Sequence, residues 1–125
     1  MEKTLVIKGT EDSPAIVFDP TSGEFSIKGR SLPEDASEFY KSAYDWLSSF
    51  IQQGNVVAEL KISLDYFNSS SLKQILMLMM LLEDSVQQGK NTRIKWCYTA
   101  DDELMEIKGR EMMSMVDVPF DIVIC

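Results

Sequence analysis

Short runs of β-branched, aliphatic and aromatic residues recur along this 125-residue chain, several of them alternating with polar residues. Alternation with a period of two is typical of strands that bury one face. It is clearest at Leu60, Ile62, Leu64 and Tyr66. The pattern predicts six strands, at Leu5–Ile7, Ala15–Phe18, Glu24–Lys28, Val56–Phe67, Thr92–Thr99 and Phe120–Ile124.

Three other segments carry apolar residues at the helical spacing of three and four. The first follows the start signals Pro33 and Asp35 and has the apolar stripe Phe39, Ala43, Trp46, Leu47, Phe50 and Ile51. The second is Leu72–Gln88, and the third runs from about Asp101 to Val116. The order β-β-β-α-β-α-β-α-β predicts one α/β domain over residues 1–125. We expect a mixed sheet with an N-terminal antiparallel hairpin and three helices packed on it.

The second helix has more apolar residues than one buried face requires. Its expected buried stripe is Leu72, Ile75, Leu76, Met79, Leu82 and Val86. Met77, Leu78, Met80 and Leu81 occupy the other sides. We expect Met77, Met80 and Leu81 to belong in part to a partner-binding surface, or else to contact a neighbouring helix. Of Met112, Met113 and Met115 in the third helix, we expect at least two to lie in the core.

The turn Asn68-Ser69-Ser70-Ser71 joins the long fourth strand to the second helix. A hydroxyl at such a junction lies close to unpaired backbone N–H groups and to the positive end of the helix dipole. It can therefore cap the helix, or it can carry a phosphate whose charge the helix start favours. The local sequence leaves both roles open.

Composition and charge argue against several functions. The net charge of -8 disfavours binding to nucleic acid or to an anionic membrane surface. The chain contains no histidine, which removes the usual acid–base and nucleophile systems, and it has no glycine-rich nucleotide loop. We therefore expect no catalytic residue, no metal and no cofactor. First-turn charge and solvation account for the acidic pairs Asp101-Asp102 and Glu83-Asp84.

The cysteines and the beginning of the chain indicate a cytoplasmic protein. Cys97 and Cys125 lie in different strand-like runs without CxxC spacing, which favours free thiols in a reducing compartment. The first apolar stretch, Leu5–Ile7, stops at Lys8 and is not typical of a secretory signal.

Two protein families share features with the chain. The segment Leu60–Trp96 resembles the core of STAS-type regulatory domains, the anti-sigma-factor antagonist group, although Asn68 replaces the usual acid and Ser71 the usual glycine. Almost the whole chain is similar to the SiaC-type biofilm-regulation phosphoproteins. The segments that carry this resemblance are Ser13–Ile16, Phe18–Pro20, Gly29–Glu34, Phe39-Tyr40, Trp46-Leu47 and Asp65–Ser71.

The resemblance implies a partner-switching module. The family's phosphoacceptor, commonly threonine, directly follows the asparagine, which points to Ser69, with Ser70 and Ser71 as the other candidates. Implied partners are a kinase with a histidine-kinase-like ATP-binding fold, a PP2C-type phosphatase and a diguanylate cyclase that the unphosphorylated protein activates. The expected partner surface comprises Tyr66, Asn68, Ser70, Ser71, Leu72, Met77, Met80 and Leu81.

Two other functions stay open at this point. A STAS-like domain can bind a small ligand, and the serine cluster could hold an anion. The chain could also be an adaptor that is never phosphorylated. Arg30 and Glu34 either touch a partner or support the first helix.

Overall fold

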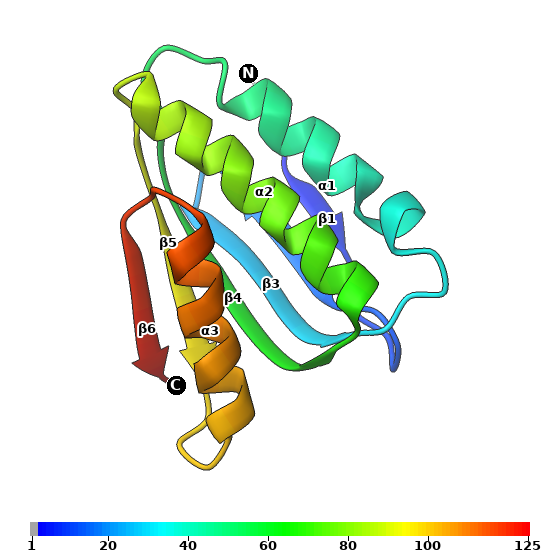
Figure 1. The fold of residues 1–125 in the computed structure, drawn as a ribbon. Helices are drawn as coiled ribbons and strands as arrows, with labels where there is room; N and C mark the ends of the chain where they lie inside the picture. Colours follow the sequence, from blue (N-terminus) through cyan, green and yellow to red (C-terminus); the bar gives the residue numbers. More distant parts are fainter. Residues whose placement is uncertain (1–2) are drawn as a thin grey trace.

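The computed structural model describes residues 3–125 and has the predicted order of strands and helices (Figure 1). The elements are β1 (Leu5–Ile7), β2 (Ala15–Asp19), β3 (Glu24–Ser31), α1 (Ala36–Phe50), β4 (Val57–Phe67), α2 (Ser69–Gln87), β5 (Asn91–Tyr98), α3 (Glu103–Met115) and β6 (Phe120–Ile124). The predicted mixed α/β sheet with its antiparallel N-terminal part is confirmed.

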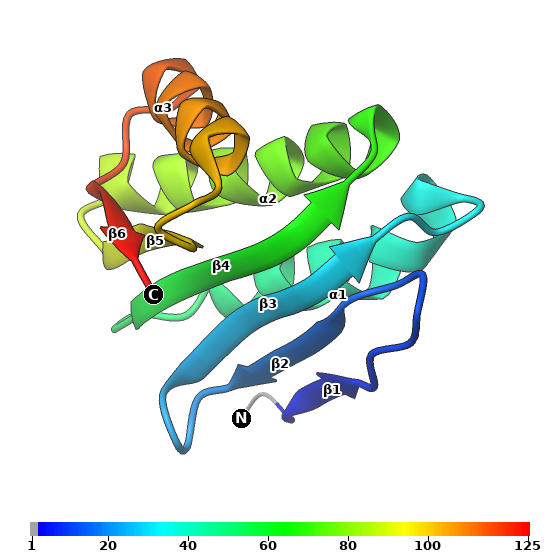
Figure 2. The same cartoon turned by 90° about the horizontal axis from the view of Figure 1, so that it is seen from below.

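The six strands lie in the sheet in the order in which they occur in the chain, β1-β2-β3-β4-β5-β6. The first two pairs are antiparallel, and the pairs from β3 to β6 are parallel. Parallel strands need right-handed crossovers, and here every crossover advances to the next strand in the same direction. All three helices therefore cover one face of the sheet and leave the other face without a helix (Figure 2).

Strand register separates an apolar face from a charged one. Ile27, Ile62 and Trp96 are partners across three strands and are all buried under the helices. One position away, the opposite face carries charged side chains. Arg93 lies 2.7 Å from Asp121 and 3.5 Å from Glu59 across three strands. These charged side chains suit a sheet face that no helix covers and that is therefore exposed to water.

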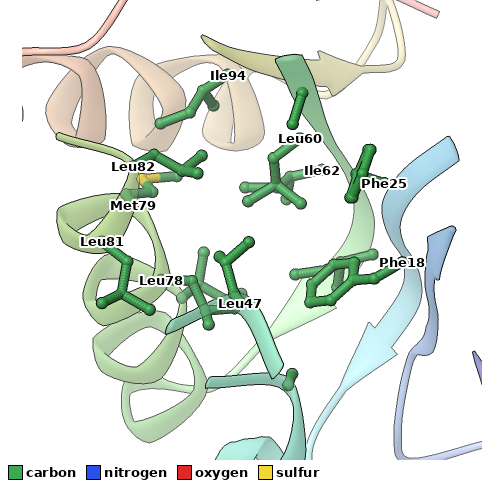
Figure 3. Close-up of a cluster of buried hydrophobic side chains, with 14 of the residues drawn as sticks. Phe18, Phe25, Leu47, Leu60, Ile62, Leu78, Met79, Leu81, Leu82 and Ile94 are labelled. Carbon is green, nitrogen blue, oxygen red and sulfur yellow. The ribbon is translucent and has the colours of Figure 1, made fainter. Parts of the chain in front are cut away.

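The core lies between the sheet and the helices, and two faces of α2 contribute side chains to it (Figure 3). Ile75, Met79 and Leu82 are buried as predicted, but Leu78 and Leu81 are buried as well. α1 packs alongside α2, so a second face of α2 is covered. The prediction that Leu81 belongs to a partner surface is therefore wrong, since only 8% of it is exposed.

α3 packs on β5 and β6 through fewer apolar residues than expected. Met112 is buried, whereas Met113 and Met115 are exposed, so only one of the three methionines predicted for this part of the core lies there. Close approach of the helix to the sheet explains the glycine in its middle. A Cβ atom on Gly109 would lie 2.5 Å from Cδ1 of the buried Trp96. The indole Nε1 also donates to the Met105 carbonyl at 3.0 Å.

The two cysteines form a disulfide, which overturns the prediction of free thiols. β5 and β6 are neighbours, and Cys97 pairs in register with Val123. Cys125 follows two residues later on the same side of the sheet, with its Cα 5.5 Å from that of Cys97. The sequence pattern placed the cysteines in separate strands but did not show that those strands are adjacent.

Candidate functional site

The serine turn becomes the first turn of α2, three residues earlier than the apolar pattern predicted. Asn68 is the residue before the helix, with extended backbone angles. Its side-chain oxygen accepts the Ser71 backbone N–H at 2.9 Å and the Ser70 hydroxyl at 3.1 Å. Asn68 therefore caps the helix, and none of the three serines is needed as the N-cap.

Ser71 belongs to a buried cluster of hydroxyl groups and not to the surface. Its side chain is fully buried and donates to the Ser31 carbonyl at 2.9 Å. The Ser31 hydroxyl in turn donates to the Ser71 hydroxyl at 2.8 Å and lies 2.6 Å from the Tyr40 hydroxyl. A kinase or another partner cannot reach Ser71 without opening the fold. The prediction of Ser71 as an alternative phosphoacceptor and as a residue of the partner surface is therefore wrong.

The direction of the hydrogen bonds in this hydroxyl cluster can be assigned. Ser31 has a single hydroxyl hydrogen, which goes to Ser71, so Tyr40 must donate to Ser31. Burial raises the pKa of Tyr40 to about 12, against the smaller lowering effect of the Ser31 hydrogen bond. The cluster thus joins the end of β3, the first turns of α1 and the start of α2.

Ser70 is exposed but lies in acidic surroundings. It shares an open depression on the surface with Glu34 and Asp35, which precede α1, and with Glu38 in the first turn of α1. Lys73 lines the same depression from α2. Three carboxylates against one ammonium group make this side of the turn unfavourable for an added negative charge.

Ser69 is exposed and faces α3. It lines two adjoining cavities of about 230 and 240 Å³, and both are also lined by Leu72 and Lys108. Among the described residues, its hydroxyl makes no hydrogen bond, unlike those of Ser70 and Ser71. The three neighbouring serines therefore have three different environments. Among them, Ser69 alone combines an exposed side chain with a hydroxyl that has no hydrogen bond to the described residues.

The structure gathers some of the predicted surface residues and separates others. Tyr66 lines one cavity together with Ser69 and Leu72 and is half exposed. The Arg30 guanidinium lies 5.7 Å from the Tyr66 ring centroid, which indicates that Arg30 supports this edge of the site. Met77 and Met80 are exposed on α2 but line neither cavity.

α3 supplies site residues that the sequence pattern did not reveal. Leu104 and Lys108 line the cavity beside Ser69, and Met115 lines the second cavity. A sequence signal did exist, because Leu104, Lys108, Glu111 and Met115 follow one another at helical spacing. Leu104 and Met115 are among the most exposed large apolar side chains of the described chain.

Among the described residues, neither a cluster of metal-ligating side chains nor a membrane-spanning helix is found. No group of three or more cysteine, aspartate or glutamate side chains within residues 3–125 is arranged to hold a metal ion. None of the helices in that part of the chain has the length and apolar character needed to cross a membrane.

A sheet in sequential order, covered on one face by helices and with an exposed serine where a parallel strand meets its helix, defines a STAS-like regulatory fold. A sequence profile of the family described as SiaC family regulatory phosphoprotein matches residues 7–125. The chain therefore belongs to the SiaC family of regulatory phosphoproteins.

Solved structures of SiaC agree with this assignment, and one curated relative is of similar identity. Apo-SiaC from Pseudomonas aeruginosa is 32% identical, with a TM-score of 0.89 over 97% of this chain and 98% of that one. SiaC crystallised in complex with the diguanylate cyclase SiaD, of which it is the activator, is 32% identical, with a TM-score of 0.92 over 97% and 99% of the two chains. An uncharacterized protein of Pseudomonas aeruginosa (strain UCBPP-PA14) is 33% identical over 94% of each chain.

Proposed function

We propose that this protein is a cytoplasmic partner-switching regulator whose unphosphorylated form binds and activates a diguanylate cyclase. Reversible phosphorylation of Ser69 would switch that interaction. The activator role is supported by the similarity to SiaC in its complex with SiaD, which extends over 97% of this chain. We assign no catalytic role to the chain itself, which agrees with its family of regulatory proteins.

The contrast among the three serines carries the assignment of the phosphoacceptor. Ser71 is buried, and Ser70 lies beside three carboxylates and is bonded to Asn68. Ser69 is exposed, and its hydroxyl has no partner within the described chain. A kinase can therefore reach Ser69 without unfolding the turn, because Asn68 and not Ser69 caps the helix.

The proposed chemistry is carried out by other proteins. In a kinase with a histidine-kinase-like ATP-binding fold, the Ser69 oxygen would attack the γ-phosphorus of ATP. The bond from phosphorus to ADP breaks, and the hydroxyl proton passes to a base or to water. A PP2C-type phosphatase would hydrolyse the ester, returning serine and inorganic phosphate. The modification adds about -1.5 to -2 charges.

That charge is large enough to control an interface. Burying it against a partner would impose a desolvation cost on a surface that also includes Tyr66 and Leu72. A difference of about 3 kcal/mol between the two states changes an affinity by more than a hundredfold. The switch therefore needs no change of fold.

Intact-mass spectrometry after incubation with the host's kinase and ATP tests the phosphoacceptor. Wild type should gain one phosphate, and Ser69→Ala should gain none. Ser70→Ala is the matched control, one residue away and also exposed in the first turn of α2, and it should gain a phosphate like wild type. A full phosphate gain in Ser69→Ala would refute the assignment.

A pull-down from the host with wild type and Ser69→Asp as baits tests the partner switch. We expect a diguanylate cyclase with wild type and a marked loss of it with Ser69→Asp. Ser69→Ala should retain the cyclase, which separates the effect of charge from that of the lost hydroxyl. Equal recovery of the cyclase by all three baits would contradict a switch at Ser69.

A further inference from the structure

A groove separates α2 from α3, and Ser69 lies on its wall. The α2 side presents Ser69, Leu72 and Leu76, and the α3 side presents Lys108 and Met115. The adjoining cavity extends the groove past Leu104. Ser69, Leu72 and Lys108 are common to both cavities, so Lys108 lies at the middle of the groove opposite the serine.

The charges around Ser69 come from three elements. Lys73 on α2 and Lys108 on α3 are the cations, and Asp65, Asp102 and Glu111 are the anions. Asp102 already accepts the Met105 backbone N–H at 3.0 Å as the cap of α3. Glu111 lies 3.5 Å from the Lys108 ammonium, which is a loose and partly solvated pairing.

Both lysines are available to a new anion. Within residues 3–125, Lys73 makes no hydrogen bond or ion pair, and the only ion pair of Lys108 is the loose one with Glu111. A phosphate dianion attracts an ammonium group more strongly than a single carboxylate does, because it carries more charge and three acceptor oxygens. Lys108 would therefore exchange Glu111 for the phosphate.

On the basis of the function proposed above, we propose that Lys108, assisted by Lys73, holds the phosphate of phosphorylated Ser69 across the groove. The contact would tie α3 to the first turn of α2. It would also place a charged bridge over the apolar lining formed by Leu72 and Leu104. The modified state is then distinguished by a closed groove as well as by added charge.

Ser70 provides an internal contrast. Its depression contains Lys73 but not Lys108, and it contains Glu34, Asp35 and Glu38. A phosphate there would meet three carboxylates and one ammonium group, whereas the two ammonium groups of Lys73 and Lys108 face three carboxylates around Ser69. Lys108 should therefore stabilise the dianion at position 69 and have little effect on one at position 70.

The test uses the full chain with phosphoserine placed at position 69 during translation by an expanded genetic code, so that no kinase is required. The second pKa of the phosphate is measured by ³¹P NMR titration. We expect Lys108→Gln to raise that pKa by about half a unit, because removing a nearby cation disfavours the dianion. Lys73→Gln should raise it by less, and the double variant by more than either.

Two controls make the titration decisive. Lys41→Gln removes an exposed lysine on α1 that pairs with Asp45, and it should leave the phosphate pKa unchanged. A chain with phosphoserine at position 70 should not respond to Lys108→Gln. If Lys108→Gln leaves the pKa at position 69 unchanged while circular dichroism shows a folded protein, the proposal is overturned. The result does not depend on whether the host phosphorylates Ser69, so this proposal and the proposed function can fail separately.

Discussion

Tyr40 and Ser31 are buried together beneath the first turn of α2, where Ser71 completes their hydrogen-bonded cluster. A buried hydroxyl without a partner would cost about 1–3 kcal/mol, so the three side chains depend on one another. Because they come from β3, α1 and α2, the cluster fixes the position of the turn that carries Ser69.

Stability at alkaline pH should depend on Tyr40. Burial raises its pKa from the ordinary 10.0 to about 12, so the folded protein holds the phenol proton more tightly than the unfolded chain does. That contribution is complete below pH 10 and is lost as the pH rises from 10 to 12. Two pKa units correspond to about 3 kcal/mol. Urea unfolding at pH 8, 10 and 11 should show the decline.

Tyr40→Phe serves as the control for this pH dependence. At pH 8 it should cost about 1 kcal/mol, because the Ser31 hydroxyl loses its donor. Above pH 10 it should decline less steeply than wild type, because the phenol is absent. Parallel declines in the two proteins would show that other groups cause the alkaline loss.

Asn68 should matter for stability more than the serine beside it. Asn68→Ala removes the acceptor of the Ser71 N–H and should lower the free energy of unfolding by about 1 kcal/mol. Ser70→Ala is the matched control and should change it by less than about 0.5 kcal/mol, since Ser70 is exposed. Chemical denaturation measures both. Equal effects would mean that the cap is not a significant source of stability.

At the scale of elements, the existence and order of strands and helices followed from the sequence, whereas contacts between elements did not. The pattern started α2 at Leu72 because the serines are polar, but Asn68 satisfies the first N–H groups and extends the helix to Ser69. The burial of Leu81 and Leu78 depends on α1 lying alongside α2. No local periodicity contains that information.

In the candidate site, too, local features could be predicted from the sequence, whereas contacts between elements could not. The serine turn was visible as a strand-to-helix junction, and the family resemblance selected Ser69 within it. Ser71 was misplaced because its burial depends on Ser31 and Tyr40, which lie 40 and 31 residues earlier in the sequence. Lys108 was missed because only the fold brings α3 opposite the turn.

The packing of α3 on the sheet should be sensitive to one methyl group. In a free helix, Gly109→Ala would be favourable by about 1 kcal/mol. Here the added Cβ would lie 2.5 Å from the ring of Trp96, which is buried and bonded to Met105. The clash should dominate and destabilise the protein by about 1–3 kcal/mol.

Thermal unfolding followed by tryptophan fluorescence measures this effect. Ser114→Ala, on the exposed side of the same helix, is the control for helix propensity and should be close to neutral. A Gly109→Ala protein as stable as wild type would show that α3 can move away from β5 at little cost.

At the scale of the whole molecule, the disulfide holds the last strand. Cys97 and Cys125 are 28 residues apart, and the loop they close includes all of α3 and β6. A loop of this length is worth about 3.5 kcal/mol by the chain-entropy estimate. Cys125→Ser should therefore lower the urea midpoint, and wild type in a reducing agent should behave in the same way. An unchanged midpoint on reduction would contradict a stabilising role for the bond.

The sequential strand order also affects how the chain folds during synthesis. Each strand pairs with the strand that left the ribosome immediately before it, so the sheet can grow from one edge as translation proceeds. No strand has to wait for a neighbour that is encoded far downstream. The order of the sheet thus coincides with the direction of synthesis from the N-terminus to the C-terminus. The turn that carries Ser69 is completed before α3, so the proposed phosphoacceptor emerges before the helix that faces it.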